Sequence, residues 1–145
     1  MRLEAGTWVL VVDGAKALIL ENAGDSAHPE LRVVRKEEND APDNRGEATT
    51  GPAPEGDAPR STADETHQFA EHRFAEGVAR DLYLAAHRGR FQRLVIVAPP
   101  KVLGTLRKAL HKEVASRLVG EVHKTLTSHP VPEIERILAA EPEAS

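Results

Sequence analysis

The residues of this chain that could carry out chemistry are few, and none of them has the spacing of a catalytic or metal site. His67 and Glu71, like His72 and Glu76, lie four apart, which predicts weak ion pairs on the surface of a helix. His67 and His72 are five apart, a rotation of about 140° on a helix, so the two imidazoles do not share a face. Cysteine is absent, as are the HExxH, GxSxG, P-loop and GxGxxG patterns. We therefore expect no catalytic residue, no metal and no cofactor.

Asp13 is the one acidic residue with a position typical of a reaction centre. It follows a short apolar segment, where RNase H-like nucleases place a metal ligand, but a two-metal site needs several converging carboxylates. Glu121 is the only other acid on an expected strand. A metal-dependent hydrolase that uses Asp13 and histidines is therefore the last-ranked hypothesis. The pair Asp13-Gly14 instead predicts a tight hairpin turn, which requires positive φ at both central residues.

Basic residues form the remaining candidate site. They gather on two expected helices and make a modest stripe that could contact phosphates, although a solvated helix face explains it equally simply. The candidate binding residues are Lys101, Arg107, Lys108, Lys112, Arg73 and Arg80.

The charge of the chain is distributed unevenly. Segment 37–66 contains nine acidic residues and two arginines, a net charge of −7, so the rest of the chain carries +3 out of a total of −4. The same segment has no Val, Ile, Leu, Met or aromatic residue, and so cannot bury enough apolar surface to offset the entropy of ordering. We expect a mobile acidic loop at 37–66, within a single domain that covers residues 1–145. The +3 of the remainder allows a polyanionic partner without requiring one.

The hydrophobic pattern predicts an α/β fold with a mixed central sheet, in the order β-β-β-loop-α-β-α-β-α. The strand at 94–98 is apolar without alternation, which predicts burial on both faces, and Pro99 and Pro100 end it. A helix joins it to the last strand, which predicts a parallel pair, whereas the first three strands are expected to be antiparallel. Strands are expected at 7–12, 17–20, 31–35, 94–98 and 118–124, and helices at 67–87, at 102–111 and from 132.

Two motifs resemble the bacterial host attachment protein family, described as required for attachment to host cells. They are W-V-L-V-V-D-G-A-K-A at 8–17, and F-x-R-L-V-I-V-A-P-P at 91–100 followed by L-G-x-L-R at 103–107. That family is similar to the middle domain of archaeal and eukaryotic peptide release factors and of Pelota, which share the hairpin, third strand, long loop, helix and apolar strand. The resemblance implies a release-factor middle-domain, RNase H-like topology, with Asp13, Gly14, Pro99 and Pro100 as structural motif residues.

The catalytic tripeptide of release factors is missing from this sequence. In that family the long loop carries a Gly-Gly-Gln that reaches the ester of peptidyl-tRNA, whereas segment 37–66 has no glutamine and Gln68 follows Thr66 and His67. An acidic loop would also be repelled by RNA phosphates. The favoured hypothesis is a non-enzymatic binding domain with an unknown protein partner and an indirect role in attachment. The alternative is a module that contacts tRNA or the ribosome.

The expected cellular location is the cytoplasm. No apolar segment reaches the length of a membrane-spanning helix and no basic region is followed by an apolar run at the N-terminus, so we expect no membrane insertion. The lack of cysteine agrees with a reducing compartment. The sequence carries no indication of the oligomeric state.

Overall fold

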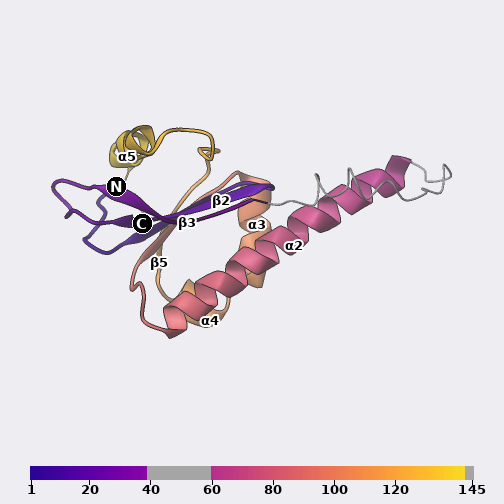
Figure 1. Cartoon of the computed structure of the whole chain (residues 1–145), viewed down its shortest axis with the longest axis horizontal. Helices are drawn as coiled ribbons and strands as arrows, with labels where there is room; N and C mark the ends of the chain where they lie inside the picture. Colours follow the sequence, from indigo (N-terminus) through magenta and orange to yellow (C-terminus); the bar gives the residue numbers. More distant parts are fainter. Residues whose placement is uncertain (39–59, 143–145) are drawn as a thin grey trace.

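The described residues form one five-stranded sheet with helices on both faces (Figure 1). The computed structural model describes residues 1–38 and 60–142. The strand order is β3-β2-β1-β4-β5; β1, β2 and β3 are antiparallel neighbours, whereas β4 and β5 continue the sheet parallel to β1. The α/β class with a mixed sheet is confirmed. The strands are β1 (Trp8–Val12), β2 (Lys16–Asn22), β3 (Leu31–Glu38), β4 (Leu94–Val97) and β5 (Leu118–Val122).

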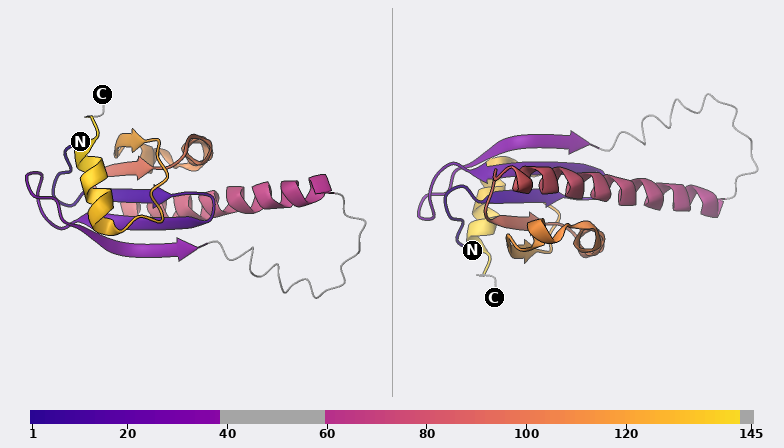
Figure 2. Two further views of the ribbon diagram at one scale, coloured as in Figure 1. Left: turned by 90° about the horizontal axis from the view of Figure 1, so that it is seen from above. Right: turned by 90° about the horizontal axis from the view of Figure 1, so that it is seen from below.

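Helices cover the sheet unequally. Three helices pack on one face and the last helix packs alone on the other, as the two views in Figure 2 show. The helices of the described residues are α2 (Arg60–His87), α3 (Pro100–Ala109), α4 (Lys112–Ala115) and α5 (Val131–Ala140). The N-terminus lies beside the end of α5, since the ammonium group of Met1 donates a hydrogen bond to the carbonyl of Glu141, just after that helix.

The two central parallel strands are buried on both faces, as the apolar run at 94–98 predicts. Leu10 and Ile96 point toward the layer of α2, α3 and α4, and Val9 and Val95 point toward α5. All four side chains are fully buried. Because successive side chains of a strand alternate between faces, a strand in the middle of such a sheet is stabilised only when every residue is apolar. This explains the absence of alternation in both segments.

The predicted loop at 37–66 is too long at both ends. β3 continues to Glu38, with Lys36, Glu37 and Glu38 opposite residues 18, 17 and 16 of β2. At the other end, α2 begins at Arg60 rather than at 67. Ladder and helix hydrogen bonds join backbone groups, so polar side chains can continue both elements without burying apolar surface. The rest of the predicted loop, 39–59, lies outside the described residues.

The hairpin between β1 and β2 is shifted by one residue from the predicted turn. Its central residues are Gly14 and Ala15, and the amide of Asp13 donates to the carbonyl of Lys16 over 2.9 Å. Oδ1 of Asp13 accepts the amides of Ala15 and Lys16, each over 2.7 Å. The glycines with positive φ among the described residues are Gly6 and Gly89, so the turn does not use the predicted positive φ at Gly14. A carboxylate that bonds its own backbone closes the turn instead.

The prolines after β4 have a second role beyond ending the strand. Pro99 is the N-cap of α3 and Pro100 its first residue, two positions earlier than the predicted start at 102. Proline suits this place because the first helical N–H has no partner within the helix. After α3 a separate turn, α4, precedes β5, and β5 ends at Val122 rather than at 124. Helix α2 ends at His87, as predicted, and Gly89 follows it with a left-handed φ of +72°.

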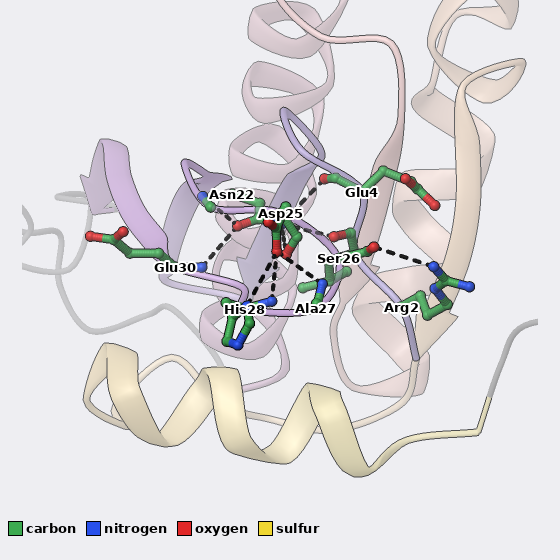
Figure 3. Close-up of polar contacts among 10 residues, drawn as sticks. Arg2, Glu4, Asn22, Asp25, Ser26, Ala27, His28 and Glu30 are labelled. Carbon is green, nitrogen blue, oxygen red and sulfur yellow. Dashed lines mark hydrogen bonds and ion pairs between the residues drawn. The ribbon is translucent and has the colours of Figure 1, made fainter.

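The loop between β2 and β3 is closed by its own polar side chains (Figure 3). Oδ1 of the buried Asn22 accepts the amides of Gly24 and Glu30 over 2.9 and 2.8 Å, and its Nδ2 donates to the carbonyl of Leu3 over 2.8 Å. Oδ1 of Asp25 accepts the amides two and three positions further along the chain. These side chains satisfy backbone groups that no strand pairs, so the cluster has a structural role.

Candidate nucleic-acid interface

Helix α3 presents two unpaired lysines on its outer face. Leu103 and Leu106 anchor the helix in the core, and Lys101 and Lys108, seven positions apart, lie on the opposite, exposed side. Within the described part of the chain, neither lysine forms an ion pair. Two ammonium groups two helical turns apart, with no carboxylate beside them, are suited to contacting an extended polyanion.

The neighbouring helix α2 carries a second basic pair with the same spacing. Arg73 and Arg80 are exposed, whereas Val78, Ala79 and Leu82 of the same helix are buried against the sheet. Helices α2 and α3 contact one another and share one hydrophobic cluster, so both basic pairs belong to one layer of the molecule. The two pairs therefore lie on adjacent helices, although they are more than twenty positions apart in the sequence.

Arg107 does not share the exposed face of the two lysines. Its Nε donates to Oε2 of Glu121 on β5 over 3.1 Å, and its second guanidinium nitrogen donates to the other carboxylate oxygen. Hydrogen bonding and charge from Arg107 hold the pKa of Glu121 below its usual value. A guanidinium already engaged by both oxygens of a carboxylate has little charge to offer a phosphate. Lys112 lies on the short α4 and is exposed.

Asp13 has a structural place at the carboxyl ends of the parallel strands. Burial raises the pKa of Asp13, but hydrogen bonds from the Thr127 hydroxyl and from the amides of Ala15 and Lys16 outweigh it and leave the pKa below the usual value. The Thr127 hydroxyl donates to Oδ2 over 2.5 Å. Both carboxylate oxygens are thus engaged within the fold. No three His, Asp or Glu side chains of residues 1–38 and 70–142 gather as metal ligands would.

A cavity of about 240 Å³ lies between β3 and the C-terminal half of α2. Its charged walls are Arg35, Asp81, Arg88 and Arg90, and none of them is among the candidate residues predicted from the sequence. These residues come from β3, from α2 and from the turn after α2, and no spacing in the sequence links all four. The two arginines on either side of Gly89 are the one signal that the sequence contains, and they indicate a helix end before they indicate a site.

Among solved structures, the chain is similar to the crystal structure of the archaeal translation termination factor aRF1, with a TM-score of 0.47 and 14% sequence identity. The match covers 92% of this chain and 37% of that chain, so this chain spans little more than a third of the termination factor. No curated protein matches the sequence. Among the described residues, no helix is long and apolar enough to cross a membrane.

Almost the whole chain matches one family model. The model, described as bacterial archaeo-eukaryotic release factor family 12, matches residues 6–138, from the residues before β1 into α5. The match supports the release-factor part of the resemblance found in the sequence, and it gives no support to the host attachment part. The chain belongs to bacterial archaeo-eukaryotic release factor family 12.

Proposed function

We propose that this chain is a release-factor-like module that contacts folded RNA of the translation machinery, tRNA or the ribosome, in the cytoplasm. The observation that carries the proposal is the family match over residues 6–138. The exposed lysines of α3 and the basic pair of α2 support it, because they provide positive charge on one layer of a chain whose net charge is −4. Phosphate contacts from lysine and arginine supply most of the affinity of non-specific RNA binding.

The proposed module binds without hydrolysing peptidyl-tRNA. The whole chain has two glutamines, Gln68 and Gln92, and no two consecutive glycines, so it cannot form the Gly-Gly-Gln tripeptide that the resemblance to release factors would require. The polar groups of Asp13 are engaged in the hairpin and with Thr127. We therefore assign the module a binding role rather than an enzymatic one.

Sedimentation with ribosomes and filter binding of tRNA test the proposal on the full chain. The informative variant is Lys101→Gln/Lys108→Gln, which removes two unpaired charges from α3. Its matched control is Lys36→Gln/Lys124→Gln, which removes two lysines that pair with Glu38 and Glu141 elsewhere on the surface. Each lost phosphate contact lowers the slope of log affinity against log salt by about 0.7 for single strands and about 0.9 for duplexes.

The expected result is salt-dependent binding by the natural chain, with a slope about 1.4 to 1.8 smaller in the α3 variant and unchanged in the control. Equal losses in both variants would show that binding follows total charge and not this face. If the natural chain neither sediments with ribosomes nor retains tRNA at low salt, the proposed function is wrong.

A further inference from the structure

The cavity between β3 and α2 combines two kinds of wall. Three guanidinium groups surround it, from Arg35, Arg88 and Arg90, together with a single carboxylate, from Asp81. The remaining walls are apolar and include the ring of Trp8, the only tryptophan of the chain. Such a mixture of convergent charged groups and apolar surface is typical of ligand-binding pockets.

The positive charge of this cavity is only partly compensated. Arg35 is paired within the fold, since its Nε lies 2.6 Å from a carboxylate oxygen of Glu37 and another of its nitrogens lies 3.6 Å from Asp81. Arg88 and Arg90 are exposed and form no ion pair or side-chain hydrogen bond with any of the described residues. Two guanidiniums at the mouth of one cavity therefore keep all of their donors available.

The apolar walls are unusual in their exposure. Four large apolar side chains of the described residues are exposed, and two of them, Val34 at 41% and Leu84 at 43%, line this cavity. They come from opposite elements, β3 and α2. An exposed apolar pair across a cavity costs hydration free energy in the free protein, which a ligand with an apolar part would recover.

The dipole of α2 explains only part of this arrangement. Arginines after the last turn of a helix are favoured by its negative end, which accounts for Arg88 and Arg90 on electrostatic grounds. It does not account for Arg35, which belongs to a strand, or for the exposure of Val34 and Leu84 beside the guanidiniums. A ligand that joins an anionic group to a flat apolar body uses all of these features together.

We infer that this cavity binds one nucleotide unit, with its phosphate held by Arg88 and Arg90 and its base against Val34 and Leu84. Guanidinium groups bond phosphate through paired N–H donors and stack on planar rings. The volume of about 240 Å³ is below the range of about 300–1,000 Å³ of pockets that enclose drug-sized ligands, so it fits a single unit and not a longer segment. The choice of a nucleotide over an acidic peptide rests on the proposed function.

The single tryptophan makes the inference directly measurable. The side-chain N–H of Trp8 gives one signal in a ¹H–¹⁵N spectrum, and it belongs to a wall of the cavity. The full chain is titrated with 5′-AMP, with adenosine and with inorganic phosphate. We expect 5′-AMP to shift the signals of Trp8, Val34 and Leu84, and to bind more tightly than either of its parts. No shift at millimolar 5′-AMP would overturn the inference, and so would a response to an Asp- and Glu-rich peptide with none to 5′-AMP.

Variants separate the cavity from general surface charge. Arg88→Gln/Arg90→Gln is expected to weaken 5′-AMP binding by at least about tenfold, because hydrogen bonds to charged groups are the strong ones. Arg93→Gln/Arg136→Gln removes the same charge from exposed positions outside the cavity and is expected to change binding little. Circular dichroism of all variants checks that the fold is kept. Equal weakening in both variants would contradict the assignment.

The source of the nucleotide is decided by two further titrations. If tRNA shifts the Trp8 signal and competes with 5′-AMP, the cavity takes a nucleotide of RNA. If 5′-AMP binds but neither tRNA nor ribosomes do, the cavity is a site for a free nucleotide and the proposed function fails alone. If RNA binds through Lys101 and Lys108 while 5′-AMP does not bind, the inference about the cavity fails and the proposed function stands.

Discussion

Arg107 on α3 donates hydrogen bonds to both carboxylate oxygens of Glu121 on β5, fourteen positions further along the chain. This contact joins α3 to the edge strand of the sheet, and it neutralises one of the positive charges predicted to contact phosphates. We therefore expect Arg107→Gln to leave RNA affinity nearly unchanged, whereas Lys108→Gln, one position away and unpaired, weakens it. Filter binding of tRNA at two salt concentrations distinguishes the two variants, and a larger loss in Arg107→Gln would contradict the assignment.

The hydrogen bond from Thr127 to Asp13 ties the segment after β5 to the first hairpin. Thr127 is buried, and Thr127→Val keeps its shape while removing the donor. We expect the free energy of unfolding to fall by about 1.5–3 kcal/mol, the usual contribution of a hydrogen bond to a charged group. Urea unfolding measures this, with Ser128→Ala, an exposed neighbouring hydroxyl, as the control.

The same bond predicts a pH dependence. The pKa of Asp13 is lowered below 3.8 in the folded protein, so its stabilisation is present above that pH and disappears as the pH falls through the folded value. The difference between the natural chain and Thr127→Val should therefore be largest near neutral pH and shrink in acid. A difference that stays constant down to strongly acidic pH would show that the valine acts through packing instead.

Glu37 predicts the opposite pH dependence. Burial, together with the hydrogen bond and negative charge of Asp81, raises the pKa of Glu37 from 4.5 to about 7, although Arg35 lies close to it. The folded protein thus binds this proton more tightly than the unfolded chain, and the stabilisation is lost as the pH rises from about 4.5 through about 7. Glu37→Gln should flatten the pH profile of urea unfolding over this interval. Glu38→Gln, the exposed neighbour, should leave it unchanged; parallel profiles for the natural chain and Glu37→Gln would refute the prediction.

Substitution by alanine should change the free energy of unfolding in opposite directions at two glycines of this chain. Gly77 lies within α2, and an added Cβ meets no atom within 4 Å, so Gly77→Ala should raise the free energy of unfolding by about 0.5–1 kcal/mol through the lower entropy of the unfolded chain. Gly89 has φ +72°, and Gly89→Ala should lower it by about 1–2 kcal/mol because of the left-handed backbone. Thermal unfolding of both variants tests the pair. If both substitutions raise the free energy of unfolding, or both lower it, the left-handed φ is not the reason for glycine at position 89.

The parts of the fold that follow from local patterns are predictable from the sequence. The uniform apolar run of β4 requires cover on both faces, and Gly89 marks the end of α2. The start of α2 is not visible in the same way, because residues 60–66 have no large apolar residue that could repeat at helical spacing. The turn after β1 lies one residue later than the sequence predicts, because the carboxylate of Asp13, not the backbone of Gly14, closes it.

The candidate sites are harder to predict because they depend on contacts between distant residues. Lys101 and Lys108 are recognisable from their spacing of seven on one helix. The pairing of Arg107 with Glu121 cannot be recognised in this way. It depends on how α3 packs beside β5, and no local sequence pattern contains that information. The cavity is even harder to predict from the sequence, because Arg35 and Arg88 line it together only when β3 and α2 are packed side by side.

Helix α2 is much longer than the surface that holds it. Its 28 residues span about 42 Å, and its first turns extend past the sheet (Figure 1). The buried side chains described for this helix fall within 75–86, and contact with the rest of the fold continues back to Glu71, which lies against Gly14 of the first hairpin. The part before Glu71, residues 60–70, is about 16 Å long, so a tilt of about 10° would displace its far end by about 3 Å. The cavity borders the packed part of the helix at Asp81 and Leu84, so a partner that tilts the projecting end would also move one wall of the cavity.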